Sequence, residues 1–401
     1  GKKMRLEDRI GNIKGKNILL LQGPMGDFFN KLDNICTKKG AFVMRIGFNA
    51  GDAYFSKTKS YFPYKSTPKQ WPKFIKKFYE VNNIDIVFLF GDCRFYHKKA
   101  IEIAKGMGID LYVFEEGYLR PGFITMEYYG VNHHSRMPRI KEFYDEYESK
   151  IEPFTAKSNS TYGVMAWWAS QYYLISNIFY FLYPNYIHHR DFSSIKEGFY
   201  GICNLFRKIK YKFSEKGLND KFEGELSGKY YFVPIQTHDD FQVRTHSRFK
   251  TMESFIEYII ASFSRYAPKD TILVFKHHPM DRGKKNYSSY IKYLSKIYKI
   301  ENRTMAIFDV HLPTVIKNSK AVVLINSTVG LNALHYSKPI ICLGKSMYDI
   351  DGLTTKDIGL DNFWNIQKPV DKQLYSKFRS YLIDHTQVIG SYYLRDGIEF
   401  R

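Results

Sequence analysis

Short apolar runs alternate with longer segments of helical spacing over the first 150 residues. The runs are contained in NILLLQGPMGDFFNKL (17–32), AFVMRIGF (41–48), IDIVFLFGD (84–92) and DLYVFEEGY (110–118). Runs that lack alternating polar positions are typical of parallel strands that helices cover on both faces. We therefore predict a doubly wound α/β domain over residues 1–150, with its ligands at the carboxyl ends of the strands.

The same alternation returns near residue 229. Apolar runs lie within KYYFVPIQTHDD (229–240), ILVFKHHPM (272–280), AVVLIN (321–326) and KPIICLG (338–344). Between them, apolar residues from Met252 to Phe263 recur at i, i+3, i+4, i+7, i+8 and i+11, which predicts one face of a helix. We predict a second Rossmann-like domain over 229–365, which faces the first across a cleft. A helical segment over 366–401 is expected to pack back on the first domain.

The segment between the two domains, 151–228, has a different pattern. Residues 162–192 are helical in spacing and dense in aromatic side chains, and FYGICNLFRKIKYKFSEKG (199–217) mixes Phe and Tyr with Lys and Arg. One hypothesis is a helical insertion that packs between domains. The other is an interfacial surface within 162–215, with aromatic side chains at the lipid headgroups and basic ones facing anionic lipid.

Charge and composition narrow the possible partners. The 401 residues carry 60 Lys and Arg against 40 Asp and Glu, a net charge of +20, which favours an anionic partner. No nucleic-acid-binding motif accompanies the charge, so we expect no nucleic acid. The four cysteines are widely spaced, which favours a reducing compartment. With no signal peptide and no apolar run of about 18 residues, we expect a cytoplasmic protein that is peripheral on the inner face of the inner membrane.

Polar residues come directly after several of the predicted strands, and packing of the core does not explain them. They are Gln22-Gly23-Pro24, Glu115-Glu116-Gly117, Gln236-Thr237-His238-Asp239-Asp240, Lys276-His277-His278-Pro279 and Asn326-Ser327-Thr328. Hydroxyls at the start of a helix, next to a Lys and a His on a neighbouring strand, are suited to a phosphate. Strand alternation predicts that His278 is directed toward the ligand and His277 the other way.

The acidic pairs suggest glycosyl chemistry. One acidic pair ends a strand in each domain. Enzymes that break glycosidic bonds commonly use two carboxylates, one as nucleophile and one as acid or base. The ordinary alternative is solvated turn residues. The D-x-D of YDIDG (348–352) is a weak candidate for a metal site. His133-His134 and His188-His189 lack metal-ligand spacing, and we expect them to be surface residues.

Five motifs together resemble a known family. They are LLLQGPMGDFF, FEEGYLRP, QTHDDFQVR, KHHP and NSTVGLNALHYSKPII. In this order they resemble the capsule polysaccharide β-Kdo transferases of the KpsS (LipB) type. The resemblance implies a GT-B glycosyltransferase fold with no metal and no other cofactor. It implies CMP-β-Kdo as donor and lyso-phosphatidylglycerol as acceptor, so that a retaining enzyme adds the first Kdo of the capsule linker. Other capsule biosynthesis or export proteins are possible partners.

The resemblance also implies residue roles. Asp240, the last residue of QTHDD, is expected to be the nucleophile and Glu115 the acid/base, although Asp239 and Glu116 remain alternatives. The CMP phosphate is expected at Lys276, His278, Ser327 and Thr328. Further substrate contacts are expected at Asn326, Gln236, Glu116, Arg120, Gln22 and Gly23.

Two other functions fit the same residues. A transferase of the same fold that uses CMP-sialic acid or another nucleotide sugar needs the same phosphate-binding groups. A non-catalytic capsule-assembly component that binds only lipid or polysaccharide needs no pair of carboxylates, so the retained acids argue against it.

Overall fold

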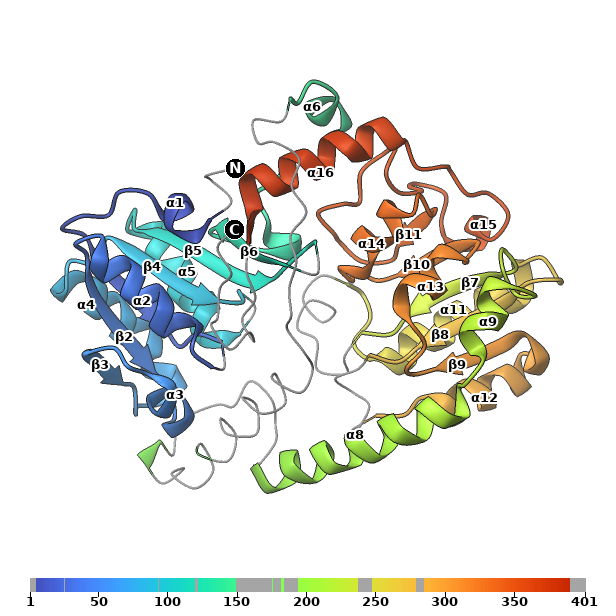
Figure 1. The fold of residues 1–401 in the computed structure, drawn as a ribbon, viewed down its shortest axis with the longest axis horizontal. Helices are drawn as coiled ribbons and strands as arrows, with labels where there is room; N and C mark the ends of the chain where they lie inside the picture. Colours follow the sequence, from blue (N-terminus) through green and yellow to red (C-terminus); the bar gives the residue numbers. More distant parts are fainter. Residues whose placement is uncertain are drawn as a thin grey trace. The chain divides into compact units, whose positions relative to one another are not determined.

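The computed structural model describes residues 5–24, 26–92, 94–119, 122–148, 194–236, 247–278 and 285–389, together with Ile175, Leu182 and Tyr183. These residues fall into two compact units. The first comprises 1–136, 148–199 and 380–401, and the second comprises 137–147 and 200–379. Each unit has its own sheet and its own core; in Figure 1 the first is mostly blue to green and the second mostly yellow-green to red, with 137–147 (green) in the second unit and 380–389 (red) in the first.

The first unit is a mixed sheet in which five parallel strands have the order 3-2-1-4-5. Their bounds are β1 (Asn17–Leu21), β2 (Phe42–Gly47), β3 (Ser60–Pro63), β4 (Ile86–Phe90) and β5 (Asp110–Glu116), in the spatial order β3-β2-β1-β4-β5. This is the strand order of a Rossmann-type sheet, whose ligands bind beyond the carboxyl ends near the β1/β4 switch point.

Two antiparallel strands extend this sheet beyond β5, where the sequence pattern had predicted parallel strands only. Strand β6 (Phe123–Tyr128) pairs with β5, and β12 (Gln387–Ile389) pairs with β6. The turn before β6 is too short for a crossover helix, so the chain must reverse. A Cβ on Gly117 would lie 2.1 Å from the Phe123 carbonyl oxygen, which explains the glycine at this tight reversal.

Helices cover both faces of the first sheet (Figure 1). On one face lie α4 (Trp71–Val81) and α5 (Phe95–Gly106), packed on Leu19 and Leu21. On the other lie α1 (Leu6–Ile10) and α2 (Phe28–Lys38), packed on Ile18 and Leu20. Successive residues of β1 are therefore buried on opposite faces, which is why the run has no polar position. The short α3 (Ala50–Phe55) follows β2.

The second unit has a parallel five-stranded sheet in the same Rossmann order. Its strands are β7 (Tyr230–Pro234), β8 (Ile272–Lys276), β9 (Thr304–Ile307), β10 (Ala321–Leu324) and β11 (Ile340–Cys342), arranged β11-β10-β7-β8-β9. The predicted fold class, two Rossmann-like units of the kind that make up a GT-B glycosyltransferase, is confirmed. The short strands β3, β6, β9 and β12 had not been predicted.

The helix predicted from the spacing of Met252 to Phe263 is α11 (Met252–Tyr266), and its apolar face is buried as expected. It packs on one face of the second sheet together with α12 (Ser288–Ile297) and α15 (Leu360–Phe363). Helices α9 (Leu218–Glu223) and α13 (Leu312–Lys317) contact Tyr230 on the other face. Two further helices bear on function: α14 (Val329–His335) lies in this unit, and α8 (Ser194–Ser214) belongs to it from Tyr200 onward.

The C-terminal segment returns to the first unit. Helix α16 (Lys372–Thr386) is the predicted helix, but it ends before the predicted segment does, because Gln387–Ile389 form strand β12. Arg9 fixes this junction by donating hydrogen bonds to the carbonyl oxygens of Ile383 and Gln387, at 3.2 and 2.8 Å. Two further short elements are α6 (Lys141–Asp145) and the 3-10 turn Asn132–His134.

Candidate active site

The second unit places three predicted residues at one edge of its sheet. Gln236 follows β7, Lys276 ends β8 and Asn326 follows β10, and these three strands are neighbours in the order β10-β7-β8. The β7/β10 boundary is the point where the strand order reverses, which is where open α/β sheets bind ligands. The structure therefore gathers the Gln, Lys and Asn motifs at the expected position.

Gln236 and Asn326 are joined by a pair of hydrogen bonds. Nε2 of Gln236 donates to Oδ1 of Asn326 at 3.0 Å, and the Asn326 backbone N donates to Oε1 of Gln236 at 3.3 Å. Gln236 is buried and Asn326 is half-buried. The pair ties the end of β7 to the end of β10, so the Gln236 side chain stabilises the sheet edge and does not project from it.

Lys276 lies almost entirely inside the protein, with 8% of its surface exposed. A buried ammonium requires an anionic or hydrogen-bonding neighbour. The carboxyl group of Glu215, just beyond α8, is close enough to feel its charge: burial raises the pKa of Glu215, and nearby backbone N–H groups and the Lys276 ammonium oppose that rise. Glu215 is held in place by the backbone N–H groups of Phe308 and Asp309, with contacts as short as 2.9 and 2.7 Å.

The adjacent histidine is a structural residue, as strand alternation predicted. His277 is 2% exposed, and its ring stacks on Phe308 with centroids 4.0 Å apart. Its Nδ1 lies 3.1 Å from the Ile307 carbonyl oxygen, and its Nε2 accepts from the backbone N of Tyr287 at 2.8 Å. Nδ1 must therefore carry the proton, because a carbonyl oxygen can only accept. His278, which follows, is half-buried, and Pro279 lies outside the described residues.

The Ser-Thr motif begins a tightly packed helix. Ser327 Oγ accepts a hydrogen bond at 3.1 Å from the backbone N of Val329, the first residue of α14, which is a local turn bond that Ser hydroxyls commonly make just before a helix. The hydroxyl of Tyr348 donates to the Ser327 carbonyl oxygen, and its ring would lie 2.3 Å from a Cβ on Gly330. Glycine is thus required at 330. Ser327 and Thr328 remain half-buried at the sheet edge.

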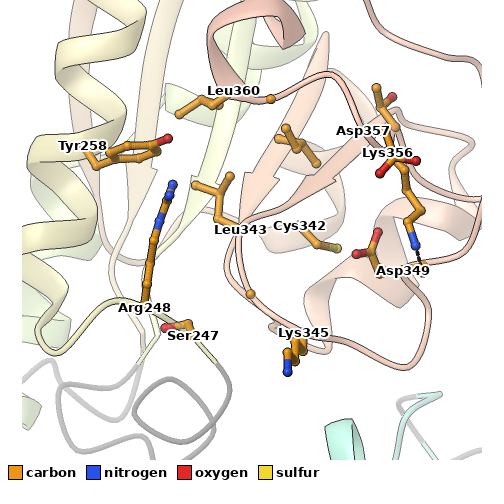
Figure 2. A pocket seen from close by; sticks show the side chains of 14 residues that line it. Ser247, Arg248, Tyr258, Cys342, Leu343, Lys345, Asp349, Lys356, Asp357 and Leu360 are labelled. Atoms are coloured by element: carbon orange, nitrogen blue, oxygen red, sulfur yellow. Dashed lines mark hydrogen bonds between the residues drawn. The ribbon is translucent and has the colours of Figure 1, made fainter.

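A pocket of about 640 Å³ lies beside this edge (Figure 2). Gly344, which lines it, donates a backbone hydrogen bond to the Ile325 carbonyl oxygen at 2.9 Å, so the pocket begins one residue from Asn326. On one side the Arg248 guanidinium lies 4.3 Å from the centroid of the Tyr258 ring. On the other lies Asp349, whose pKa burial raises and whose side chain accepts from Thr354 at 2.6 Å. The pocket combines a flat apolar surface with groups of both charges.

In the first unit, Gln22 is a buried part of a polar network. It has a positive φ of 60° and is 2% exposed. Its Nε2 donates to Asp52 at 3.1 Å, while its backbone oxygen accepts from Arg45 at 3.0 Å. Gly23 follows with φ 98°, and a Cβ there would lie 2.5 Å from the Phe29 ring. Gln22 and Gly23 therefore shape the turn after β1.

Glu115 and Glu116 end β5 and are both half-buried. A Cβ on Gly91 would lie 3.9 Å from Oε2 of Glu115 and 4.0 Å from Nη2 of Arg94, so a carboxylate and a guanidinium flank that glycine. Arg94 also donates to the Phe90 carbonyl oxygen at 2.7 Å. The carboxyl ends of β4 and β5 therefore place a carboxylate and a guanidinium on either side of Gly91.

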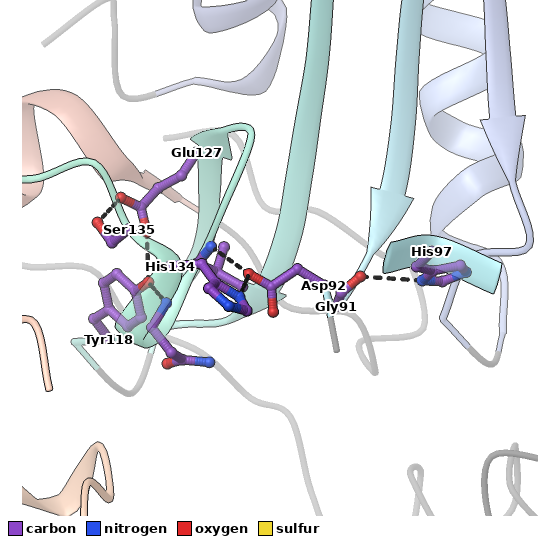
Figure 3. Close-up of polar contacts among 9 residues, drawn as sticks. Gly91, Asp92, His97, Tyr118, Glu127, His134 and Ser135 are labelled. Atoms are coloured by element: carbon purple, nitrogen blue, oxygen red, sulfur yellow. Dashed lines mark hydrogen bonds and ion pairs between the residues drawn. The ribbon is translucent and has the colours of Figure 1, made fainter. Parts of the chain in front are cut away.

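The sequence interpretation missed a second polar group at this edge (Figure 3). Asp92, buried directly after β4, accepts from the Val131 backbone N and lies against Nδ1 of His134, both at 2.9 Å. The His134 side chain is 37% exposed. The signal was present in the sequence, since FGD (90–92) follows an apolar strand just as the recognised motifs do. His133-His134 had been interpreted as plain surface residues.

His97 lies next to this group but has no access to ligand. It is fully buried, and burial lowers its pKa well below the ordinary value, so the ring is neutral. Its Nδ1 lies 3.0 Å from the Gly91 carbonyl oxygen and holds that turn (Figure 3).

Three predicted site residues, Asp240, Asp239 and Arg120, lie outside the described residues. Within the part of the chain that is described, no group of three or more His, Cys, Asp and Glu side chains is arranged to hold a metal ion. In YDIDG, the Asp349 carboxylate accepts a hydrogen bond from the Thr354 hydroxyl, and Asp351 is exposed.

Comparison with known proteins decides the family. The family model described as "Capsule polysaccharide biosynthesis protein" matches residues 85–393. The chain belongs to this family. It is 38% identical over 381 residues to the Escherichia coli "Capsule polysaccharide export protein KpsS", covering 95% of this chain and 98% of that protein. It is 36% identical to the "Capsule polysaccharide modification protein LipB" of Neisseria meningitidis serogroup A, covering 97% and 94%.

The likeness to solved structures is more distant. One is Thermosulfurimonas dismutans KpsC, described as a beta Kdo 2,7 transferase, with 15% identity, coverage of 90% and 89%, and a TM-score of 0.41. At this distance the likeness adds no weight to the family assignment. Among the described residues of this capsule biosynthesis protein, no helix is long and apolar enough to cross a membrane.

Proposed function

We propose that this capsule biosynthesis protein is a retaining β-Kdo glycosyltransferase that transfers the first Kdo of the capsule linker from CMP-β-Kdo to lyso-phosphatidylglycerol. The observation that carries the proposal is the edge formed by Lys276, Gln236 and Asn326 at the switch point of a Rossmann-like sheet. Membership of the family and the five motifs that resemble KpsS-type transferases support it.

The CMP phosphate is assigned to Lys276, His278, Ser327 and Thr328. As the bond between sugar and phosphate breaks, negative charge builds on the phosphate oxygens, and fixed donors around them stabilise the transition state. The largely buried Lys276 is suited to this role because a desolvated cation interacts more strongly with a phosphate than an exposed one does. His277 contributes indirectly, since its stacked ring fixes the end of β8.

The adjacent pocket of about 640 Å³ is assigned to the nucleoside. Its volume lies in the range of ordinary ligand pockets. The ring of Tyr258 and the planar guanidinium of Arg248 provide flat surfaces against which a pyrimidine can stack. Gly344 in the pocket wall bonds to Ile325, the residue before Asn326, which supports placing the base in this pocket when the phosphate lies at the Ser-Thr motif.

The two acids are assigned to a double displacement. In the first step the carboxylate of Asp240 bonds to the anomeric carbon, the bond from that carbon to the phosphate oxygen breaks, and CMP leaves with the electron pair. In the second step an acceptor hydroxyl attacks the same carbon, its proton passes to the Glu115 carboxylate, and Asp240 is released. Two inversions retain the anomeric configuration.

Release of CMP tests the donor assignment. CMP-Kdo and CMP-sialic acid are incubated separately with the protein and lyso-phosphatidylglycerol, with EDTA present, and CMP is quantified. We expect acceptor-dependent release from CMP-Kdo and none above background from CMP-sialic acid. Release from CMP-sialic acid alone would show that CMP-sialic acid, and not CMP-Kdo, is the donor. Release from neither would favour a non-catalytic component, as the word "export" in the name of one relative suggests.

A further inference from the structure

Helix α8 presents a row of large apolar side chains to solvent. Ile202, Leu205, Phe206, Ile209 and Phe213 are each between 50% and 75% exposed. Their spacing of i, i+3, i+4, i+7 and i+11 places all five on one side of the helix. We call this row the α8 stripe. At 1.5 Å per residue it is roughly 16 Å long.

The opposite side of the helix fixes which way the α8 stripe faces. Tyr211 is buried and stacks on Phe308 with ring centroids 3.7 Å apart and planes at 7°. Its hydroxyl oxygen accepts from Asn286 at 3.3 Å. Glu215, one turn on, binds the backbone of the residues at 308 and 309. Since Tyr211 and Glu215 hold one side against the second unit, the α8 stripe is directed away from it.

Basic residues border the α8 stripe. At 100° per residue, Lys210 lies along one side of the stripe and Lys212 along the other, and both are exposed, as is Lys216 just beyond the helix. The segment 202–214 contains no Asp and no Glu. Arg207, by contrast, is half-buried. A row of apolar side chains bordered by basic ones matches the surface of an anionic bilayer, whose headgroup layer is negatively charged and whose interior is apolar.

We propose that the α8 stripe docks on an anionic lipid surface, with the helix axis in the plane of the headgroups. Insertion of the five apolar side chains and attraction of the bordering lysines to lipid phosphates are the two forces that hold interfacial helices. A protein partner would need an acidic rim of matching length, whereas an anionic bilayer supplies one everywhere. The proposal goes beyond the proposed function and is independent of the donor sugar.

The stack of rings gives this docking a route to the candidate active site. Tyr211 stacks on Phe308, Phe308 stacks on His277, and His277 directly follows Lys276. Stacked rings thus connect α8 to the end of β8 within the second unit. Lipid contact at the α8 stripe therefore lies on the same body as the CMP-phosphate residues.

Vesicle flotation tests the proposal. The full chain is mixed with phosphatidylglycerol-containing vesicles or with pure phosphatidylcholine vesicles, at low and high salt. Two variants probe the two forces: Phe206→Ser with Phe213→Ser, and Lys210→Ser with Lys212→Ser. Matched controls on α4 and its end are Lys73→Ser with Lys76→Ser, which removes two exposed lysines, and Val81→Ser, which removes one exposed apolar side chain.

The wild type should float with anionic vesicles, less so at high salt, and scarcely with neutral ones. Each α8 variant should lose on the order of tenfold in binding while both controls behave as wild type. CMP affinity measured on the same variants should be unchanged, which separates a loss of docking from a loss of fold or donor site. Equal binding of the wild type to both vesicle types, no binding to either, or full binding by the lysine variant would overturn the proposal.

Discussion

Gln236 and Asn326 exchange two hydrogen bonds across the β7/β10 boundary, with Nε2 of Gln236 donating to Oδ1 of Asn326 at 3.0 Å and Oε1 accepting from the Asn326 backbone N at 3.3 Å. The two strands belong to motifs 90 residues apart in sequence. A side-chain amide can serve both partners here, because it offers a donor and an acceptor together.

Replacing Gln236→Met should lower both stability and CMP affinity. Methionine fills a similar volume but leaves the Asn326 backbone N–H and Oδ1 without these partners, which costs about 1–3 kcal/mol. Chemical unfolding measures the first effect and calorimetric titration with CMP the second. Gln367→Met serves as a control for the substitution, because Gln367 bonds carbonyl oxygens at 363 and 364, away from the edge. CMP affinity equal to wild type would show that the pair does not shape the nucleotide site.

Lys276→Met and His278→Ala should each weaken CMP binding as well as turnover. Both groups are assigned to the phosphate in the bound ground state, and the loss of one charge-assisted hydrogen bond costs about 1.5–3 kcal/mol. Methionine is chosen at 276 because it preserves the aliphatic packing of a side chain that is 8% exposed.

Calorimetric titration with CMP gives the affinity directly. Lys317→Met, on the exposed surface of α13, is the matched control and should bind CMP as wild type does. If both Lys276→Met and His278→Ala keep wild-type affinity, the phosphate binds elsewhere.

Asp240→Ala should abolish transfer and leave CMP affinity largely intact. A nucleophile acts on the anomeric carbon in the transition state and adds little to the binding of the nucleotide. Product formation and CMP titration are measured on the same preparation, with Asp239→Ala alongside. Near-normal turnover by Asp240→Ala, with loss of turnover in Asp239→Ala, would move the role to Asp239.

Glu215→Gln should destabilise the second unit. The Glu215 carboxylate accepts from the backbone N–H groups of Phe308 and Asp309, whereas the amide of glutamine offers only one acceptor atom and sets N–H against N–H. Loss of one such bond at a partly buried site costs about 1–3 kcal/mol, which denaturant unfolding near neutral pH can measure.

The pH dependence of stability distinguishes this carboxyl from a surface one. Because burial raises the pKa of Glu215, the folded protein binds its proton more tightly than the unfolded chain does. The bound proton therefore adds a contribution to the free energy of unfolding that is fully present below the unfolded pKa and is lost as pH rises through the folded pKa, while the bonds from Phe308 and Asp309 to the ionised carboxylate remain. Glu215→Gln should remove that decline. An unchanged pH profile in the variant would contradict the assignment.

Much of the fold was predictable because continuous apolar runs allow few other structures. NILLL, IVFLF and ILVFK are strands as expected, and their order along the chain follows the Rossmann pattern. The short edge strand Gln387–Ile389 was predicted as part of a helix, because its pairing with β6 depends on residues more than 260 positions away. Local patterns carry no information about such pairing.

The candidate site was predicted in part for the same reason. Lys276, Gln236 and Asn326 stand out because they follow apolar strands. The pocket beside them could not be predicted. Its lining residues Arg248, Tyr258 and Gly344 come from separate loops and a helix, and no sequence pattern links them. The direction in which α8 faces was also open until Tyr211 was found against Phe308, since spacing alone cannot say which side of a helix is covered.

Mass spectrometry of the acceptor tests the central claim most directly. Lyso-phosphatidylglycerol is incubated with CMP-Kdo and the full chain, and the lipid fraction is analysed for the mass of one added Kdo residue, with Asp240→Ala as the control. The account predicts a lipid whose mass has increased by one Kdo residue with the wild type and an unmodified lipid with the variant. Unmodified lipid after incubation with a wild-type protein that binds CMP would contradict it.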